Sequence, residues 1–209
     1  MQDKLNNMIN NIKIFKSNTY YRLGDAILQY KNTKYIYDKI KDNRDYDNTI
    51  LKYYLENNKT MNLKYLKINL INAINKKINT LNNFIFPKND ELVIHLRLGD
   101  VIFHPKRYMT KNYESIIDDY ITKYNIKFVT IVTAFNYAGY TNYIYSDEKQ
   151  NNNINNLKNL LNKLIIKFNL INFNIISNDD ADLDFIYMYK SKYFLEDISG
   201  YSNLIKQIR

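Results

Sequence analysis

The sequence predicts an α/β fold in which a parallel β-sheet carries helices on both faces. Short runs rich in Val, Ile and Phe recur between residues 91 and 195, and such continuously apolar runs are typical of strands buried on both sides. The stretches between them have apolar residues three or four positions apart, as in amphipathic helices. The chain has 209 residues, of which 45% are hydrophobic, which is enough for one globular domain or a domain with a small appendage.

Residues 1–90 are predicted to form a short, mostly helical region. Its expected elements are a short strand at 11–15 and helices at 25–40, 49–56 and 63–81. In the last of these segments, Leu66, Leu70 and Ile74 lie four residues apart and so share one helix face. Pro87 ends the region, because proline cannot continue a helix.

Residues 91–209 are predicted to alternate strands with helices. The expected strands are 91–97, 128–133, 173–177 and 193–195, and the expected helices are 108–124, 151–168, 182–191 and 199–208. Thr110 is the candidate N-cap of the first helix, and the Asn-rich stretch 150–156 is expected to be a loop that enters a helix. This alternation predicts βαβ units, whose ligands bind beyond the carboxyl ends of the strands.

The net charge of +9 is unevenly distributed. Residues 1–90 hold 16 Lys and Arg against 8 Asp and Glu, whereas residues 91–209 hold 14 against 13. Asn, Ile, Lys and Tyr are all abundant and share A/T-rich codons. We therefore attribute the lysine excess to an AT-rich genome, such as that of some large DNA viruses or protozoa. This interpretation favours solvated basic faces over a groove for nucleic acid.

Composition also excludes several classes of protein. The absence of cysteine excludes disulfides, thiol catalysis and cysteine-ligated zinc, and two histidines leave little for a histidine-rich metal site. No apolar run is long enough for a membrane-spanning helix, and the polar N-terminal segment lacks the apolar core of a secretory signal. We expect a soluble cytoplasmic protein.

The first candidate site is the segment HLRLGD (His95–Asp100), which closes the expected strand 91–97. Alternation along a strand puts His95 and Arg97 on one face. The planar guanidinium of Arg97 suits a phosphate, because its donors form a fork. The structural alternative is that Arg97 pairs with a carboxylate such as Asp100 to close a turn.

The second candidate site is the segment Ser177–Phe185, in which four aspartates occur between positions 179 and 184. A carboxylate at the start of a helix is favoured by the helix dipole, so capping explains one or two of them. Three interpretations remain for the others: recognition of a nucleotide base, a divalent cation, or solvated surface acids.

The third candidate site is the segment Glu196–Asn203, which follows the expected strand 193–195. Ser199 and Ser202 lie where a helix is expected to begin, and a helix N-terminus attracts phosphate. Simple N-capping is the structural alternative. Since all three candidate sites follow strands of one presumed sheet, we expect them to converge at one edge.

Together these motifs resemble the nucleotide-binding half of the fucosyltransferase superfamily, which has the GT-B fold. The resemblance covers residues 91–209 and implies a Rossmann-like C-terminal half of a reduced GT-B fold, with residues 1–90 as a reduced acceptor half. It further implies GDP-fucose or a related nucleotide-sugar as the donor, a glycan or glycoconjugate as the acceptor, and no metal.

The resemblance also implies roles for individual residues. It assigns donor contacts to His95 and Arg97, to Asp182 or Asp184, and to Ser199, Gly200 and Ser202. The segment RLGDAILQ at residues 22–29 resembles a glycine turn of the α1,2 type, which adds Arg22 and Gly24. One departure is Leu98, which stands where many members of the family carry a second arginine.

Sugar transfer needs a cation for the departing diphosphate and a base for the acceptor hydroxyl. Arg97 suits the first role, and Asp100, Asp25 and His95 are candidates for the second. Two other functions stay open. Leu98 and the short first half are compatible with a descendant that binds without catalysis, and the charge of residues 1–90 is compatible with nucleic-acid binding.

Overall fold

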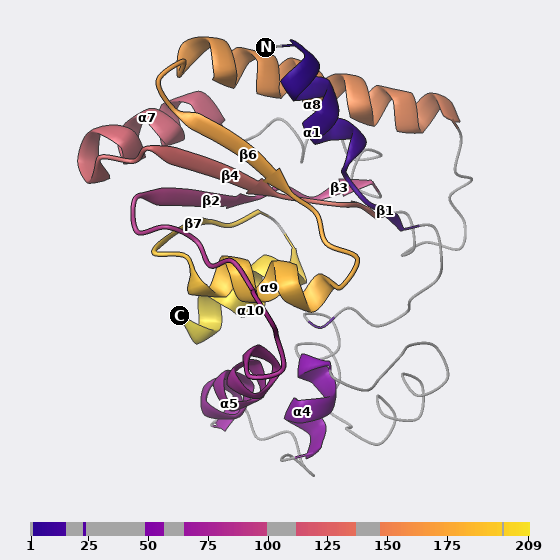
Figure 1. Ribbon diagram of the computed structural model, residues 1–209, viewed down its shortest axis with the longest axis vertical. Coiled ribbons are helices and arrows are strands. Elements are labelled where there is room, and N and C mark those ends of the chain that lie inside the picture. The colour runs from indigo at the N-terminus through magenta and orange to yellow at the C-terminus, as the bar shows by residue number, and fades with distance from the viewer. Residues whose placement is uncertain are drawn as a thin grey trace.

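A computed structural model of the chain describes residues 2–15, 23, 49–56, 65–99, 112–136, 147–197 and 199–209. It has a central sheet between two helical layers (Figure 1). Helices α1 (Gln2–Asn10), α7 (Tyr113–Tyr124) and α8 (Asp147–Lys167) cover one face, and α9 (Ala181–Lys190) and α10 (Gly200–Ile208) cover the other. Helices α4 (Ile50–Glu56) and α5 (Leu66–Ile78) lie beyond α9 and α10 (Figure 1). The predicted α/β class is confirmed.

The main sheet has four parallel strands. They are β2 (Glu91–His95), β4 (Phe128–Val132), β6 (Asn172–Ile176) and β7 (Tyr193–Leu195), in the order β6-β4-β2-β7. Numbered along the chain, this order is 3-2-1-4. Neighbouring residues of β2 point to opposite layers: Leu92 packs among residues of α1, α7 and α8, and Val93 among residues of α9 and α10. Burial on both faces explains why the strands are continuously apolar.

A second, smaller sheet continues the main one past its carboxyl edge. Strands β1 (Ile14–Phe15), β5 (Phe135–Asn136) and β3 (Leu98–Gly99) pair in parallel in the order β1-β5-β3. Between the two sheets, the Leu96 N–H donates to the Val132 carbonyl at 3.0 Å, and Thr133 Oγ1 donates to the Leu96 carbonyl at 2.5 Å. The chain segments of β2 and β4 therefore stay side by side across the break.

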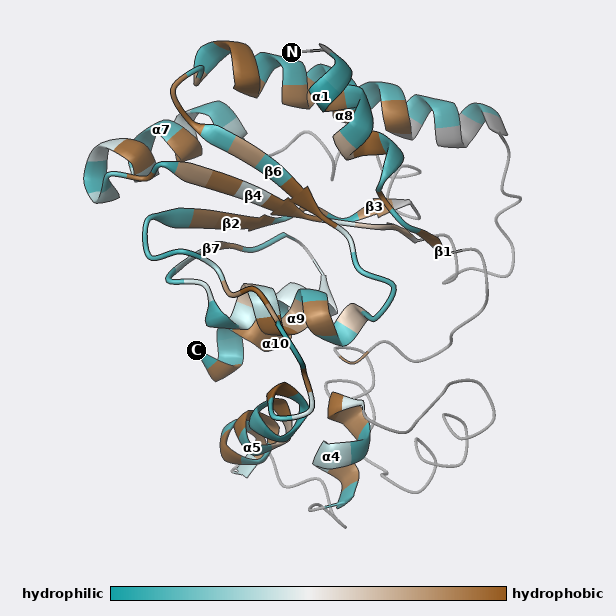
Figure 2. Cartoon of the chain, in the orientation of Figure 1, coloured by the Kyte–Doolittle hydropathy of each residue, from teal (hydrophilic) through white to brown (hydrophobic). Residues whose placement is uncertain are grey.

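Each face of the main sheet has its own apolar core. On one face, α1, α7 and α8 bury a group that includes Leu5, Ile9, Ile117, Leu157, Leu161 and Leu164. On the other face, α9 and α10 bury a group that includes Phe185, Leu204 and Ile205 together with Leu70 and Ile74 of α5. Figure 2 shows the strands largely hydrophobic and the helices divided between hydrophobic and hydrophilic positions. Segments from the first 90 residues thus pack on both faces of the α/β unit.

Three local predictions were wrong. The Asn-rich stretch 150–156 lies inside α8 rather than in a loop, because the buried side chains that follow it hold the helix despite the low helix propensity of asparagine. Helix α7 is capped by Asn112, whose side chain accepts the Ser115 N–H at 3.2 Å, and not by Thr110. Leu98 and Gly99 form strand β3, although no strand was expected beyond Arg97.

Two further differences concern helices in the first 90 residues. Helix α1 was not predicted at all; it forms because Leu5 and Ile9 share one face and are buried. The predicted helix at 25–40 lies outside the described residues. Within the ranges that the structure describes, no helix is long and apolar enough to cross a bilayer.

A buried hydrogen bond ties α9 to the amino end of β2. Tyr187 donates its hydroxyl proton to Glu91 Oε1 at 2.6 Å, and Glu91 Oε2 accepts the Lys88 N–H at 2.8 Å. We expect Tyr187→Phe to lower the free energy of unfolding by about 1.5–3 kcal/mol at pH 7, since a buried carboxylate loses a donor. Urea unfolding measures this. Tyr189→Phe, on the more exposed side of the same helix, is the matched control, and an equal effect of both substitutions would contradict the prediction.

Candidate functional site

The order of the main sheet places a topological switch point beside β2. From β2 the chain goes to β4 and β6 on one side, and it later returns to β7 on the other side. Open parallel sheets bind ligands at such a point, beyond the carboxyl ends of the strands. Five residues lie at or just beyond the ends of β2 and β7 here, and we call them the switch-point cluster: His95, Arg97, Asp197, Ser199 and Ser202.

His95 contacts the Ser-rich turn that begins α10. His95 Nδ1 is hydrogen-bonded to Ser202 Oγ, 107 residues away in the sequence, and Ser199 Oγ lies 3.5 Å from the same nitrogen. The ring centroids of His95 and Tyr201 are 5.7 Å apart. Two of the three predicted site motifs therefore meet.

The same two serines form the start of α10, where Ser199 is the N-cap. Ser199 has an extended backbone, and its hydroxyl accepts the Ser202 N–H at 3.0 Å. The Ser202 hydroxyl is fully buried, accepts the Asp197 N–H at 3.3 Å and lies 3.3 Å from Ser199 Oγ. Gly200 is the first residue of the helix, so the positive end of the helix dipole lies beside His95. Ser199 thus both caps α10 and lies beside His95, and Ser202 joins the first turn of α10 to the imidazole.

Arg97 is held through its backbone by a residue that the sequence had not singled out. The Arg97 N–H donates to Asp197 Oδ2 at 2.8 Å. Asp197 also acts on the start of α7, because burial, and secondarily the charge of Asp197, raise the pKa of the Tyr113 hydroxyl. The end of β2, the start of α7 and the turn after β7 therefore meet at Asp197. A signal that could have found it is a carboxylate just past a strand end.

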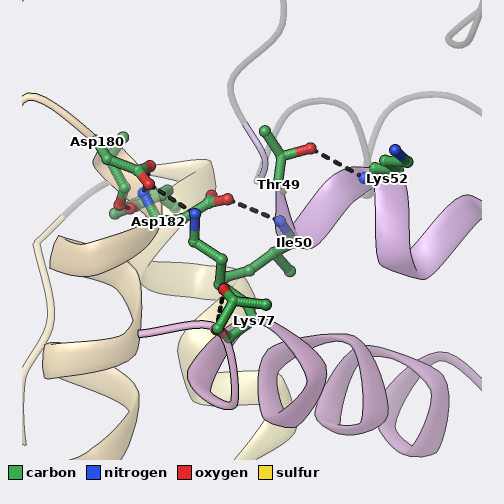
Figure 3. Close-up of polar contacts among 9 residues, drawn as sticks. Thr49, Ile50, Lys52, Lys77, Asp180 and Asp182 are labelled. Atoms are coloured by element: carbon green, nitrogen blue, oxygen red, sulfur yellow. Dashed lines mark hydrogen bonds and ion pairs between the residues drawn. The ribbon is translucent and has the colours of Figure 1, made fainter. Parts of the chain in front are cut away.

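The aspartates of the second motif bind other parts of the chain. Asp182, which is buried, accepts the N–H of Ile50 at 2.7 Å, at the first residue of α4 (Figure 3). Asp180 caps α9 by accepting the Asp182 N–H at 2.9 Å, and its other oxygen pairs with Lys77 Nζ at 2.8 Å (Figure 3). Asp179 pairs with Lys13 at 2.9 Å on the surface. These contacts join α9 to the helices and strand of the first 90 residues.

Asp184, the last acid of this motif, is buried next to Asn178. Its Oδ1 accepts from Asn178 Nδ2 at 2.6 Å and from the Asn178 N–H at 3.3 Å. Burial raises the pKa of Asp184 to about 7, although the hydrogen bonds from Asn178 lower it; the nearby charge of Asp180 adds to the increase. The role of Asp182 and Asp184 in binding a nucleotide stays a prediction.

This raised pKa predicts a pH-dependent stability. The folded chain keeps the Asp184 proton up to about pH 7, whereas an unfolded aspartate loses it near pH 3.9. The folded state therefore binds more protons between these values, and the free energy of unfolding falls as the pH rises, by up to about 1.4 kcal/mol per pH unit. Urea unfolding from pH 4 to 8 measures this dependence. The difference in the free energy of unfolding between the native chain and Asp184→Asn should fall as the pH rises toward 7. Parallel pH curves would contradict it.

Tyr201 links the second motif to the switch-point cluster. Its hydroxyl donates to the Ala181 carbonyl at the start of α9, and its ring lies 5.1 Å from that of Phe185 and 5.7 Å from that of His95. The starts of α9 and α10 are therefore adjacent.

The predicted site residues Asp25, Asp100, Arg22 and Gly24 lie outside the described residues. In the part of the chain that the structure describes, no group of three or more acidic or histidine side chains is arranged to hold a metal ion.

The fold and the site define a class: an α/β protein with a four-stranded parallel sheet of order 3-2-1-4 and a polar cluster at its switch point. Comparison of the chain with models of protein families, with curated proteins and with solved structures found no match.

Proposed function

We propose that this protein is a glycosyltransferase that uses a nucleotide-sugar, with GDP-fucose as the first donor to test and a glycan as the acceptor. The observation that carries the proposal is the contact between His95 and Ser202 beside Arg97 at the switch point. A guanidinium, an imidazole, the Ser199 hydroxyl and a helix N-terminus are groups that bind a diphosphate. The proposed architecture is the Rossmann-like half of a reduced GT-B fold.

The geometry supports a division of roles. Arg97 and the N-terminus of α10 would stabilise the negative charge that develops on the departing diphosphate. We assign His95 to a phosphate oxygen of the donor, because it lies beside Ser202 at the N-terminus of α10. The base for the acceptor hydroxyl is then a carboxylate, for which Asp25 and Asp100 are the candidates.

A donor panel tests this proposal. Thermal unfolding is measured with GDP-, UDP- and dTDP-sugars, and the responding donors are then assayed for hydrolysis and for transfer to glycans. We expect GDP-sugars to raise the unfolding temperature, because a ligand that binds only the folded state stabilises it. A chain that responds to none of these nucleotides, and that binds DNA with a strong dependence on salt, would overturn the proposal.

A second candidate is a descendant that binds the nucleotide without transferring the sugar. Leu98 favours it, because this residue, in the place of the family's second arginine, is fully buried in strand β3. The arrangement therefore offers one guanidinium where many members of the resembled family have two. Donor binding with neither hydrolysis nor transfer would identify this function.

A further inference from the structure

We infer that Asp197 is a positioning residue that holds the switch-point cluster in the geometry needed to bind a diphosphate. The ligand named here rests on the proposed function; the contacts do not. The Asp197 side chain accepts the Arg97 N–H at 2.8 Å, and its own N–H donates to Ser202 Oγ at 3.3 Å. Ser202 in turn contacts His95 Nδ1. One residue thus connects to both groups that would meet the ligand.

The position of Asp197 follows from the strand register. β2 and β7 pair as far as Ile94 and Leu195, and β7 ends there. Beyond that point, the Leu96 N–H is taken by the Val132 carbonyl on the β4 side. In a strand, successive N–H groups point to opposite neighbours, so the Arg97 N–H points to the β7 side, where the strand has ended. The Asp197 carboxylate supplies the acceptor that a longer β7 would have supplied.

The use of a side-chain acceptor in place of a backbone carbonyl matters because Arg97 lies in the break between β2 and β3. Successive residues of a central strand are held by hydrogen bonds to the two neighbouring strands in turn, and at Arg97 the bond on the β7 side comes from a side chain. Without that acceptor the Arg97 amide loses its partner, and the backbone that carries the guanidinium can move. A small displacement of a charge-assisted contact is enough to weaken binding.

Two substitutions of Asp197 separate positioning from charge. Asp197→Asn keeps an oxygen that can accept the Arg97 N–H and removes the negative charge, whereas Asp197→Ala removes both. We expect Asp197→Ala to weaken GDP binding, measured by calorimetry, by about tenfold, and to raise the hydrogen-exchange rate of the Arg97 amide by a similar factor. Asp197→Asn should restore both quantities to within about threefold of the native values.

A matched control and two outcomes decide the inference. Tyr187→Phe loses a buried hydrogen bond at the opposite, amino end of β2; it should lower stability and leave GDP affinity unchanged. Native affinity and native amide exchange in Asp197→Ala would overturn the inference, and so would failure of Asp197→Asn to restore them. If the native chain binds none of the nucleotides of the donor panel, the proposed function fails, and exchange at the Arg97 amide still tests the positioning role.

Discussion

Arg97→Ala is expected to weaken the binding of GDP-fucose by roughly 10- to 100-fold while the chain remains folded. The Arg97 side chain is half-buried at the switch point, and a charge-assisted hydrogen bond to phosphate contributes more than a neutral one. The backbone contact with Asp197 does not depend on the side chain, so alanine keeps the loop in place. Calorimetry with GDP-fucose measures the affinity, and thermal unfolding verifies the fold.

Arg97→Lys is the control for charge. Lysine keeps the positive charge and loses the planar fork, so we expect an affinity between those of the native chain and the alanine variant. An Arg97→Ala chain that binds GDP-fucose within about tenfold of the native chain would remove Arg97 from the site.

Asp182→Ala is expected to lower the free energy of unfolding by about 1–4 kcal/mol. The substitution leaves the Ile50 N–H without this acceptor, which costs about 1–3 kcal/mol for a buried donor. It also removes a negative charge from the start of α4, which contributes about 0.3–1 kcal/mol more. Because Asp182 joins α9 to α4, the loss should separate the helical layer of α4 and α5 from the α/β unit. Urea unfolding measures the change.

Two variants distinguish the loss of the buried hydrogen bond from the loss of charge or of a surface ion pair. Asp182→Asn keeps an acceptor for Ile50 and should lose much less stability. Asp179→Ala removes a surface ion pair with Lys13, in which Asp179 is 82% exposed, and such pairs contribute at most about 1 kcal/mol. Equal losses for Asp182→Ala and Asp179→Ala would show that Asp182 has no special part in joining the layers.

The periodicity of residues 91–209 predicted the elements of the α/β unit well, because burial on both faces forces continuously apolar strands. Strand 193–195 was predicted with the observed bounds, and helix 182–191 begins and ends within one residue of α9. The same approach missed α1. Its few apolar residues stand among polar ones. The helix is stable only because these residues pack against α8 and the sheet.

The candidate site was predicted in part. Two strand ends of one parallel sheet had to share an edge, and His95 does meet Ser199 and Ser202 there. The distant partners of Asp179, Asp180 and Asp182 could not be predicted, since they lie more than 100 positions away in the sequence. Nothing in local spacing indicates a contact over such a distance.

The sequence by itself determined the alternation of strands and helices and the residues that stand where each strand ends. These follow from side-chain period and burial, which are local properties of the chain. Only the tertiary structure decided that β7 pairs with β2 and not with β6, that an aspartate side chain continues the ladder past the end of β7, and that Asp180 and Asp182 at the start of α9 hold the helical layer of α4 and α5. Those outcomes depend on which groups the packed layers bring within hydrogen-bond distance.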